Sequence, residues 1–300
     1  MGDTVTVRGT ARIVRTIAEL REVADAVRAE GGTVGFLGTS GNLHVGHLTL
    51  IERMATECDL AVIPLYEAAV QPVPGLLDFD IGMAAGFERD GAADRAKAIN
   101  AGVDVVFMPE VDEMYPQLPV RIHVAPDDAL ASPWDNAENP AFVRMTATAV
   151  AKIWNIVGPC RYYAGEKDWV PLAVLRRIID DLSFRVELVA CPIVREADGV
   201  CASSRNAKLS PTDRAAAPVL YAALTEATSL VEGGERRPEV VRDLLGRRIE
   251  PVAPVDYAEV VDAATLERVD PLQGDLRVLV SADFSGVHLF DNVGVTVDGA

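Results

Sequence analysis

The chain has 300 residues, of which 49% are hydrophobic and 24% charged, with a formal net charge of -17. This length can form one large domain or two ordinary ones, each with a buried core. The negative charge argues against nucleic acid or an anionic membrane as the main partner. No apolar run approaches the ~20 residues of a membrane span, and the first residues lack the pattern of a signal peptide. We therefore expect a cytoplasmic protein.

Short apolar strands alternate with amphipathic helices over roughly the first two thirds of the sequence. Thr16 and Glu19 form a T-x-x-E capping box that starts the first helix. We expect strands at 33–37, 60–65, 103–108, 161–164 and 185–190, and further helices at 46–56, 89–101, 141–157 and 169–182. This alternation predicts an α/β domain, with a parallel sheet covered by helices on both faces.

The pattern changes after about residue 190, where an irregular stretch over 192–211 begins. We expect helices at 212–231 and 238–248, and strands at 257–261, 276–282 and 287–297. Because helices and strands no longer alternate, this part is predicted to form a separate, smaller α+β domain. The expected domains are therefore residues 1–190 and 191–300. The four cysteines show no metal-ligand spacing, so free or buried thiols are expected.

The segment 38–51, G-T-S-G-N-L-H-V-G-H-L-T-L-I, joins an expected strand to an expected helix and carries two of the four histidines. Ligands of an open parallel sheet bind beyond the carboxyl ends of its strands, and a helix N-terminus attracts phosphate. His44 and His47 can donate hydrogen bonds to phosphate oxygens and stabilise the charge that develops as pyrophosphate leaves. A structural role is the alternative for a bare H-x-x-H. A metal pair would usually be four residues apart, with further ligands.

Two further clusters suit the same chemistry. Gly165-Glu166-Lys167-Asp168 follows an expected strand, so that Lys167 can neutralise phosphate and Asp168 can accept hydrogen bonds from ribose hydroxyls. The loop Ser203-Ser204-Arg205 offers two hydroxyls and a guanidinium that can close over a triphosphate. Each cluster alone could equally be an ordinary surface turn.

In this order the three clusters closely resemble the pantothenate synthetase (pantoate–β-alanine ligase) family, from about residue 13 to residue 297. The family pattern P-T-M-G-x-L-H-x-G-H corresponds to 38–47, G-E-K-D to 165–168, and V-R-E-A-D-G-x-x-x-S-S-R-N to 194–206. The closing Leu289-Phe290-Asp291-Asn292 also matches. The resemblance implies a Rossmann-like, H-x-G-H type nucleotide-binding domain and a C-terminal lid domain.

The resemblance also implies an ATP-dependent condensation of a small carboxylic acid with an amine. The acid becomes an acyl-adenylate with loss of pyrophosphate, and the amine then displaces AMP. A homodimer and a requirement for Mg²⁺ are implied as well. The catalytic residues implied are His44, His47, Lys167, Ser203, Ser204 and Arg205, and the implied ATP contacts are Thr39, Gly46, Gly165, Asp168 and Val194.

The metal ligand implied by the resemblance is Asp94, on the helix before the strand at 103–108. Asp90 lies one turn earlier, and Lys97 stands where the family has Gln. Either aspartate could instead be a solvated helix residue.

Departures from the family concentrate where the acid should bind. The family run F-V-N-P-x-Q-F is changed at 66–72, which begins with Tyr66 and keeps Gln71, and the second pantoate-binding Gln is replaced by Pro171. Arg144 is a new polar candidate. A proline has neither an amide side chain nor an N–H, so we expect an acid other than pantoate. The alternative is a pantothenate synthetase that holds pantoate with Gln71 and new partners.

Two other functions remain open at this stage. Enzymes with H-x-G-H folds also include nucleotidyltransferases, but the sequence shows no additional basic cluster for a phosphorylated acceptor. A non-catalytic paralog would bind nucleotide without turning it over. The retention of all three clusters argues against that loss.

Overall fold

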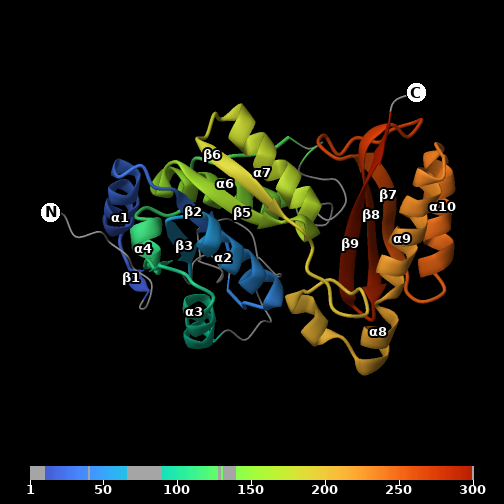
Figure 1. Ribbon diagram of the computed structural model, residues 1–300, viewed down its shortest axis with the longest axis horizontal. Coiled ribbons are helices and arrows are strands. Elements are labelled where there is room, and N and C mark those ends of the chain that lie inside the picture. Colours follow the sequence, from blue (N-terminus) through green and yellow to red (C-terminus); the bar gives the residue numbers. More distant parts are fainter. Residues whose placement is uncertain (1–10, 40, 66–89, 128–129, 131–139, 299–300) are drawn as a thin grey trace. The chain divides into compact units, whose positions relative to one another are not determined.

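The computed structural model describes residues 11–39, 41–65, 90–127, 130 and 140–298 (Figure 1). Contacts divide the chain into two compact units, which are described separately. The first unit contains Val174–Cys191 and the strands before it, and the second contains Pro192–Ala300 together with Glu166–Ala173. The expected domain boundary at 190/191 places 166–173 in the first domain, whereas these residues group with the second unit.

The first unit is built on a six-stranded parallel sheet with the order β1-β4-β3-β2-β5-β6. These strands are β1 (Arg12–Val14), β4 (Val105–Phe107), β3 (Leu60–Pro64), β2 (Val34–Leu37), β5 (Cys160–Gly165) and β6 (Val186–Cys191). Every residue of β2, β3 and β4 is buried, as expected for strands covered on both faces. The α/β prediction is therefore confirmed.

Helices connect these parallel strands. They are α1 (Ile17–Ala29), α2 (Val45–Glu57), α3 (Gly91–Asn100), α4 (Val111–Met114), α6 (Pro140–Val157) and α7 (Trp169–Asp181). The helix α1 packs against α6, and α2 packs against β2, β3 and β5. The predicted capping box is present, because Thr16 and Glu19 bond to each other's backbone N–H groups.

The strand β2 lies between β3 and β5, which places it where the strand order reverses. Phe36 of β2 pairs with Tyr162 of β5, and Leu37 with Tyr163. Parallel neighbours end at the same edge of a sheet, so the turns after β2 and β5 leave from the position at which open sheets of this kind bind ligands.

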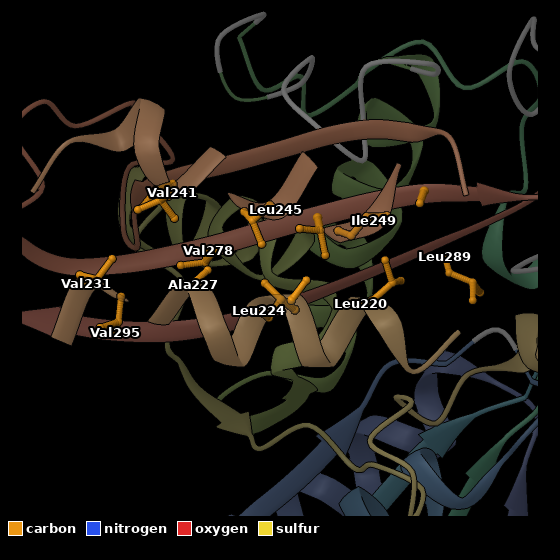
Figure 2. Close-up of a cluster of buried hydrophobic side chains, with 14 of the residues drawn as sticks. Leu220, Leu224, Ala227, Val231, Val241, Leu245, Ile249, Val278, Leu289 and Val295 are labelled. Carbon is orange, nitrogen blue, oxygen red and sulfur yellow. The ribbon is translucent and has the colours of Figure 1, made fainter. Parts of the chain in front are cut away.

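The second unit contains an antiparallel sheet of β7 (Val255–Asp262), β8 (Gly274–Phe284) and β9 (Val287–Val297). Two helices, α9 (Val219–Glu232) and α10 (Pro238–Ile249), cover one face of this sheet. Figure 2 shows Leu224 and Val231 of α9 and Leu245 of α10 directed at strand residues that include Val278 and Val295. The α+β prediction is confirmed.

Three local features differ from the sequence expectation. The single helix expected at 212–231 is two helices, α8 (Pro211–Ala216) and α9, separated at Ala217-Pro218, because Pro218 carries no backbone N–H to continue the α8 ladder. The strand β1 and the helix α4 were not predicted. Both are too short to show a hydrophobic period, and β1 is recognised by its pairing with β4.

The cysteines and the helix lengths bear on two expectations from the sequence. All four cysteines are free and buried. Among the helices that the structure describes, none is long and apolar enough to cross a membrane.

Candidate active site

The histidine turn, residues 38–47, joins β2 to α2 in the first unit. His44 is the N-cap of α2, and its Nδ1 accepts a hydrogen bond from the Gly46 N–H at 3.1 Å. The Nδ1 of His47 accepts one from the His44 N–H at 3.5 Å, and the two ring centroids lie 4.2 Å apart. A neutral imidazole has one N–H, so both rings carry the proton on Nε2 in this arrangement. The turn therefore orients two Nε2–H donors.

Two glycines allow the backbone of the turn to follow this path. Gly41 has a φ of 88°, and a Cβ there would lie 3.0 Å from Asp94 Oδ2. A Cβ on Gly38 would lie 2.1 Å from the buried Tyr162 hydroxyl. Gly38 stands where the family pattern has Pro, and the tyrosine occupies the space that a side chain would need. Thr39 Oγ1 accepts a hydrogen bond from the Gly41 N–H at 3.1 Å.

Asp94, predicted as a metal ligand, is the buried partner of this turn. Its Oδ1 accepts a hydrogen bond from the Leu43 N–H at 2.8 Å, and its Oδ2 accepts one from the Asn42 N–H. The ammonium of Lys97 donates to the Leu43 carbonyl at 2.9 Å and lies 3.9 Å from Asp94 Oδ1. The carboxylate thus braces the loop that leads into His44.

These contacts fit a direct Mg²⁺ ligand poorly. Both carboxylate oxygens already accept amide hydrogen bonds, and a lysine stands beside them. Within the residues that the structure describes, no group of three or more His, Cys, Asp or Glu side chains could hold a metal ion. Mg²⁺ bound together with a nucleotide needs few protein ligands, and the metal role of Asp94 stays a prediction.

The G-E-K-D stretch divides between the units. Gly165 ends β5 in the first unit, where a Cβ on it would lie 3.9 Å from Leu50 of α2. Glu166–Asp168 forms a 3-10 turn in the second unit, just before α7. The Lys167 ammonium lies 3.1 Å from Asp168 Oδ1 and 3.9 Å from the centroid of the Phe290 ring. Asp168, predicted to hold the ribose, therefore contacts the lysine in this structure.

The S-S-R loop, residues 203–205, belongs to the second unit. Ser203 caps a 3-10 helix (Ser204–Lys208), and its Oγ accepts a hydrogen bond from the Arg205 N–H at 3.2 Å. Arg205 donates to the His288 carbonyl at 2.9 Å, and its guanidinium carbon lies 4.5 Å from the Phe290 ring centroid. The carbonyl of Val194 accepts a hydrogen bond from the Ala202 N–H at 2.9 Å, which closes the base of the loop.

A pocket of about 20 Å³ opens beside this loop, large enough for a water molecule. Lys167, Ser203, Arg205, Tyr221 and Phe290 are among its lining residues. The structure therefore brings together three of the predicted catalytic residues from segments about 40 residues apart.

Cys201 also lines this pocket but is unsuited to nucleophilic catalysis. Burial raises the pKa of its thiol from 9.0 to about 12. The nucleophilic form of a cysteine is the thiolate, so Cys201 is not expected to act as a nucleophile at neutral pH.

The segment Asp291–Asn292 of β9 holds this region together, a role that the sequence did not reveal. Asp291 pairs with Arg195 through two hydrogen bonds of 2.6 and 2.9 Å. Asn292 Nδ2 donates to the carbonyls of Glu166 at 3.1 Å and of Lys167 at 2.8 Å. The match of L-F-D-N to the family was a signal, but it did not indicate which contacts these residues make.

The buried Arg277 of β8 completes this arrangement. Its Nε donates to Asn292 Oδ1 at 2.6 Å, and its guanidinium carbon lies 3.7 Å from the Trp169 ring centroid. A second nitrogen of the guanidinium lies 3.2 Å from Glu166 Oε2. The turn that carries Lys167 is thus bonded through both its backbone and its side chains.

The predicted acid-binding residues are described only in part. Tyr66 and Gln71 lie outside the described residues. Arg144 is exposed on α6 in the first unit, and Pro171 is half-buried in the first turn of α7, in the second unit. Their role toward the acid stays a prediction.

The chain is similar to known proteins over most of its length. The family model described as Pantoate-beta-alanine ligase matches residues 12–294. A protein named Pantothenate synthetase 2, from Frankia alni, is 65% identical over 97% of this chain and 87% of its own length. Pantothenate synthetase 1 from the same organism is 39% identical over 94% of this chain and 98% of its own length.

Solved structures agree in fold. A pantothenate synthetase from Thermus thermophilus aligns with a TM-score of 0.82 at 36% sequence identity, over 95% of this chain and 100% of that one. A pantoate-beta-alanine ligase from Francisella tularensis, solved with Beta-gamma ATP and Beta-alanine, aligns with a TM-score of 0.71 at 21% identity, over 95% of this chain and 97% of that one. At that identity the second alignment supports the fold alone.

Proposed function

Because this chain belongs to the pantoate-beta-alanine ligase family, and so is an ATP-dependent ligase, we propose that it condenses pantoate with β-alanine. The proposal departs from the sequence-based preference for a different acid. A relative that is 65% identical carries the name Pantothenate synthetase 2, and no finding supports an altered substrate. The alternative stated from the sequence is therefore the better one.

In this reaction a pantoate carboxylate oxygen attacks the α-phosphorus of ATP and the bond to the β-phosphate oxygen breaks. Pyrophosphate leaves, and pantoyl adenylate forms. The amine of β-alanine then attacks the acyl carbon, loses a proton, and displaces AMP to leave an amide. Both steps need stabilisation of developing negative charge rather than a protein nucleophile.

The main support for the proposal is the geometry of the histidine turn. Both imidazoles use Nδ1 as an acceptor of backbone N–H groups, which directs the proton to Nε2. Donors held in this way cost little reorganisation when charge develops on a phosphate oxygen. The N-terminus of α2, which His44 caps, adds the positive end of a helix dipole.

The second unit carries two cations that are suited to bind phosphate. Lys167 and Arg205 both line the pocket at the S-S-R loop, and each can neutralise a phosphate oxygen. The Ser203 and Ser204 hydroxyls are further donors in this proposal. Bound Mg²⁺ would shield the phosphate charges of ATP. The homodimer and the cytoplasmic location expected from the sequence remain predictions.

The test is a product analysis with the purified protein, pantoate, β-alanine and Mg-ATP. We expect AMP and pyrophosphate in equal amounts by ³¹P NMR, and a product with the mass of pantothenate. Formation of ADP and orthophosphate would rule out the adenylate route. A screen in which another acid clearly exceeded pantoate in kcat/KM would rule out pantoate as the substrate.

A further inference from the structure

The ring of Phe290, in β9, contacts both Lys167 and Arg205. The Lys167 ammonium lies 3.9 Å from its ring centroid, and the Arg205 guanidinium carbon lies 4.5 Å from it. Both distances fall within the ~6 Å range in which a cation is attracted to the ring face. The two cations come from segments 38 positions apart in the sequence, and they meet through this ring.

The face of the sheet to which Phe290 belongs explains this position. Side chains alternate along a strand, so Leu289 and Val295 face the hydrophobic core with α9, as Figure 2 shows for both residues. By the same alternation Phe290 and Asn292 share the opposite face. Asn292 bonds the backbone of Glu166 and Lys167, while Phe290 contacts the Lys167 side chain.

The same strand segment, residues 288–292, also contacts Arg205 and Arg195. Arg205 donates to the carbonyl of His288, two residues before Phe290. Asp291 neutralises Arg195, which donates to the Gly199 carbonyl at 2.9 Å, within the family run that precedes the S-S-R loop. The segment 288–292 therefore contacts both basic residues in the described lining of the pocket, Lys167 and Arg205.

Two like charges at one aromatic ring repel each other, and an anion between them relieves the repulsion. A ring face attracts both cations without adding a negative charge. The Lys167 ammonium also pairs with Asp168 Oδ1 at 3.1 Å, so a phosphate oxygen would compete with this carboxylate for the lysine.

We propose that Phe290 is a positioning residue that holds Lys167 and Arg205 for the pyrophosphate portion of ATP. The inference rests on the proposed function, since it assigns a role to a residue at that same site. It adds that the ring face, and not apolar bulk alone, is what position 290 requires.

The experiment compares Phe290→Leu with Phe290→Tyr. Leucine keeps an apolar side chain but removes the ring, whereas tyrosine keeps the ring. Calorimetric titration of the full-length protein with pyrophosphate and with ATP measures the affinity of each variant. We expect Phe290→Leu to weaken both ligands about tenfold, the loss expected for cation–π contacts of ordinary strength. Phe290→Tyr should stay within about twofold of the wild type.

Phe184→Leu is the control. The Phe184 ring contacts Trp154 in the first unit, with ring centroids 5.4 Å apart, and Phe184 is not among the pocket-lining residues. Loss of the Phe184 ring should leave pyrophosphate affinity within about twofold of the wild type. Thermal unfolding of each variant establishes that it is folded.

Several results would overturn the proposal. These are wild-type affinity in Phe290→Leu, an equal loss in Phe290→Tyr, or no binding of either ligand by the wild type. The proposed function is tested apart from this, because it would fail if the wild type bound ATP and pyrophosphate but made no AMP from pantoate and β-alanine.

Discussion

The two regions that carry the phosphate motifs are built in different ways. In the histidine turn, His44 and His47 are oriented by bonds to backbone groups two or three residues away. In the second unit, the Lys167 turn depends on Asn292, 125 positions along the chain, and Arg205 depends on the His288 carbonyl, 83 positions away. The orientation of the two imidazoles is therefore locally encoded, although Asp94 braces the turn from 51 positions away. The Lys167 and Arg205 contacts exist only when the C-terminal sheet has formed. Substitution of either histidine should therefore separate rate from stability, whereas substitutions that support Lys167 should couple them.

The largest effect is expected at the histidine turn. His44→Ala or His47→Ala should lower kcat by about 10²–10³, the usual loss for a preorganised donor to developing charge. Loss of the His44 N-cap should cost only about 1 kcal/mol of stability. Steady-state kinetics and thermal unfolding measure the two quantities. His123→Ala, an exposed histidine elsewhere in the first unit, is the control. A near-wild-type rate in either variant would make the turn structural.

The next effect tests long-range support in the second unit. Asn292→Ala leaves the carbonyls of Glu166 and Lys167 and the Nε of Arg277 without this partner. We expect a loss of about 1–3 kcal/mol in the free energy of unfolding for the unsatisfied groups. Misplacement of Lys167 should lower kcat/KM for ATP by about 10–100-fold.

Asn155→Ala is the control for that variant, because the Asn155 side chain donates to the Ala151 carbonyl of its own helix, only four residues away. Denaturant unfolding and ATP kinetics are measured for both. The comparison between the two regions breaks down if Asn292→Ala loses activity with unchanged stability, since support of Lys167 would then not be coupled to the sheet.

A smaller effect is expected at the brace of the histidine turn. Asp94→Asn retains one acceptor oxygen but turns an NH₂ group toward a backbone N–H, so we expect a loss of about 1–2 kcal/mol in stability and roughly tenfold in kcat. Asp90→Asn is the control: Asp90 caps α3 through its Oδ1, and Asn caps a helix as well as Asp does.

The Mg²⁺ concentration for half-maximal rate distinguishes the two roles of Asp94. A brace leaves this concentration within about twofold of the wild type, whereas a metal ligand raises it by about tenfold or more. A large rise in Asp94→Asn, absent from Asp90→Asn, would restore the metal assignment predicted from the sequence.

The smallest expected effect is slow reaction of one buried cysteine in each unit with an alkylating reagent. Burial raises the pKa of Cys160, in β5, and of Cys201, beside the S-S-R loop, from 9.0 to about 12. A raised thiol pKa means that the folded protein keeps both groups protonated, and the stability this contributes is lost only as the pH rises from about 9 toward 12. At about pH 8 the native protein should therefore react slowly with iodoacetamide at both cysteines, and the unfolded protein rapidly, as peptide mass spectrometry can measure. Rapid labelling of native Cys201 would mean that the pocket opens.

Motifs with a local physical signal were predictable from the sequence alone. The capping box at Thr16, the start of α2 at the histidine turn, and the apolar strands β2 and β3 each follow from neighbours a few residues apart. The predicted helix at 46–56 differs from α2 by one residue at each end. Glycines at 38 and 41 indicated a close backbone approach, and the structure identifies the groups approached as Tyr162 and Asp94.

Tertiary structure alone decided what each polar residue contacts. A sequence gives the spacing of Asp94, Phe290 and Asn292 but not their partners. Asp94 accepts a hydrogen bond from Leu43, 51 positions away, and Asn292 donates to Glu166, 126 positions away, so these contacts arise only when the chain folds. The short strand β1 was also decided by tertiary structure. Its three residues are too few to show a hydrophobic alternation, and it is a strand because it pairs with β4. Asp94 was assigned to a metal by its place in the sequence. In the fold its carboxylate accepts hydrogen bonds from two backbone N–H groups. Burial of a charged carboxylate is costly unless it has such partners, and hydrogen bonds can meet this need as a cation would.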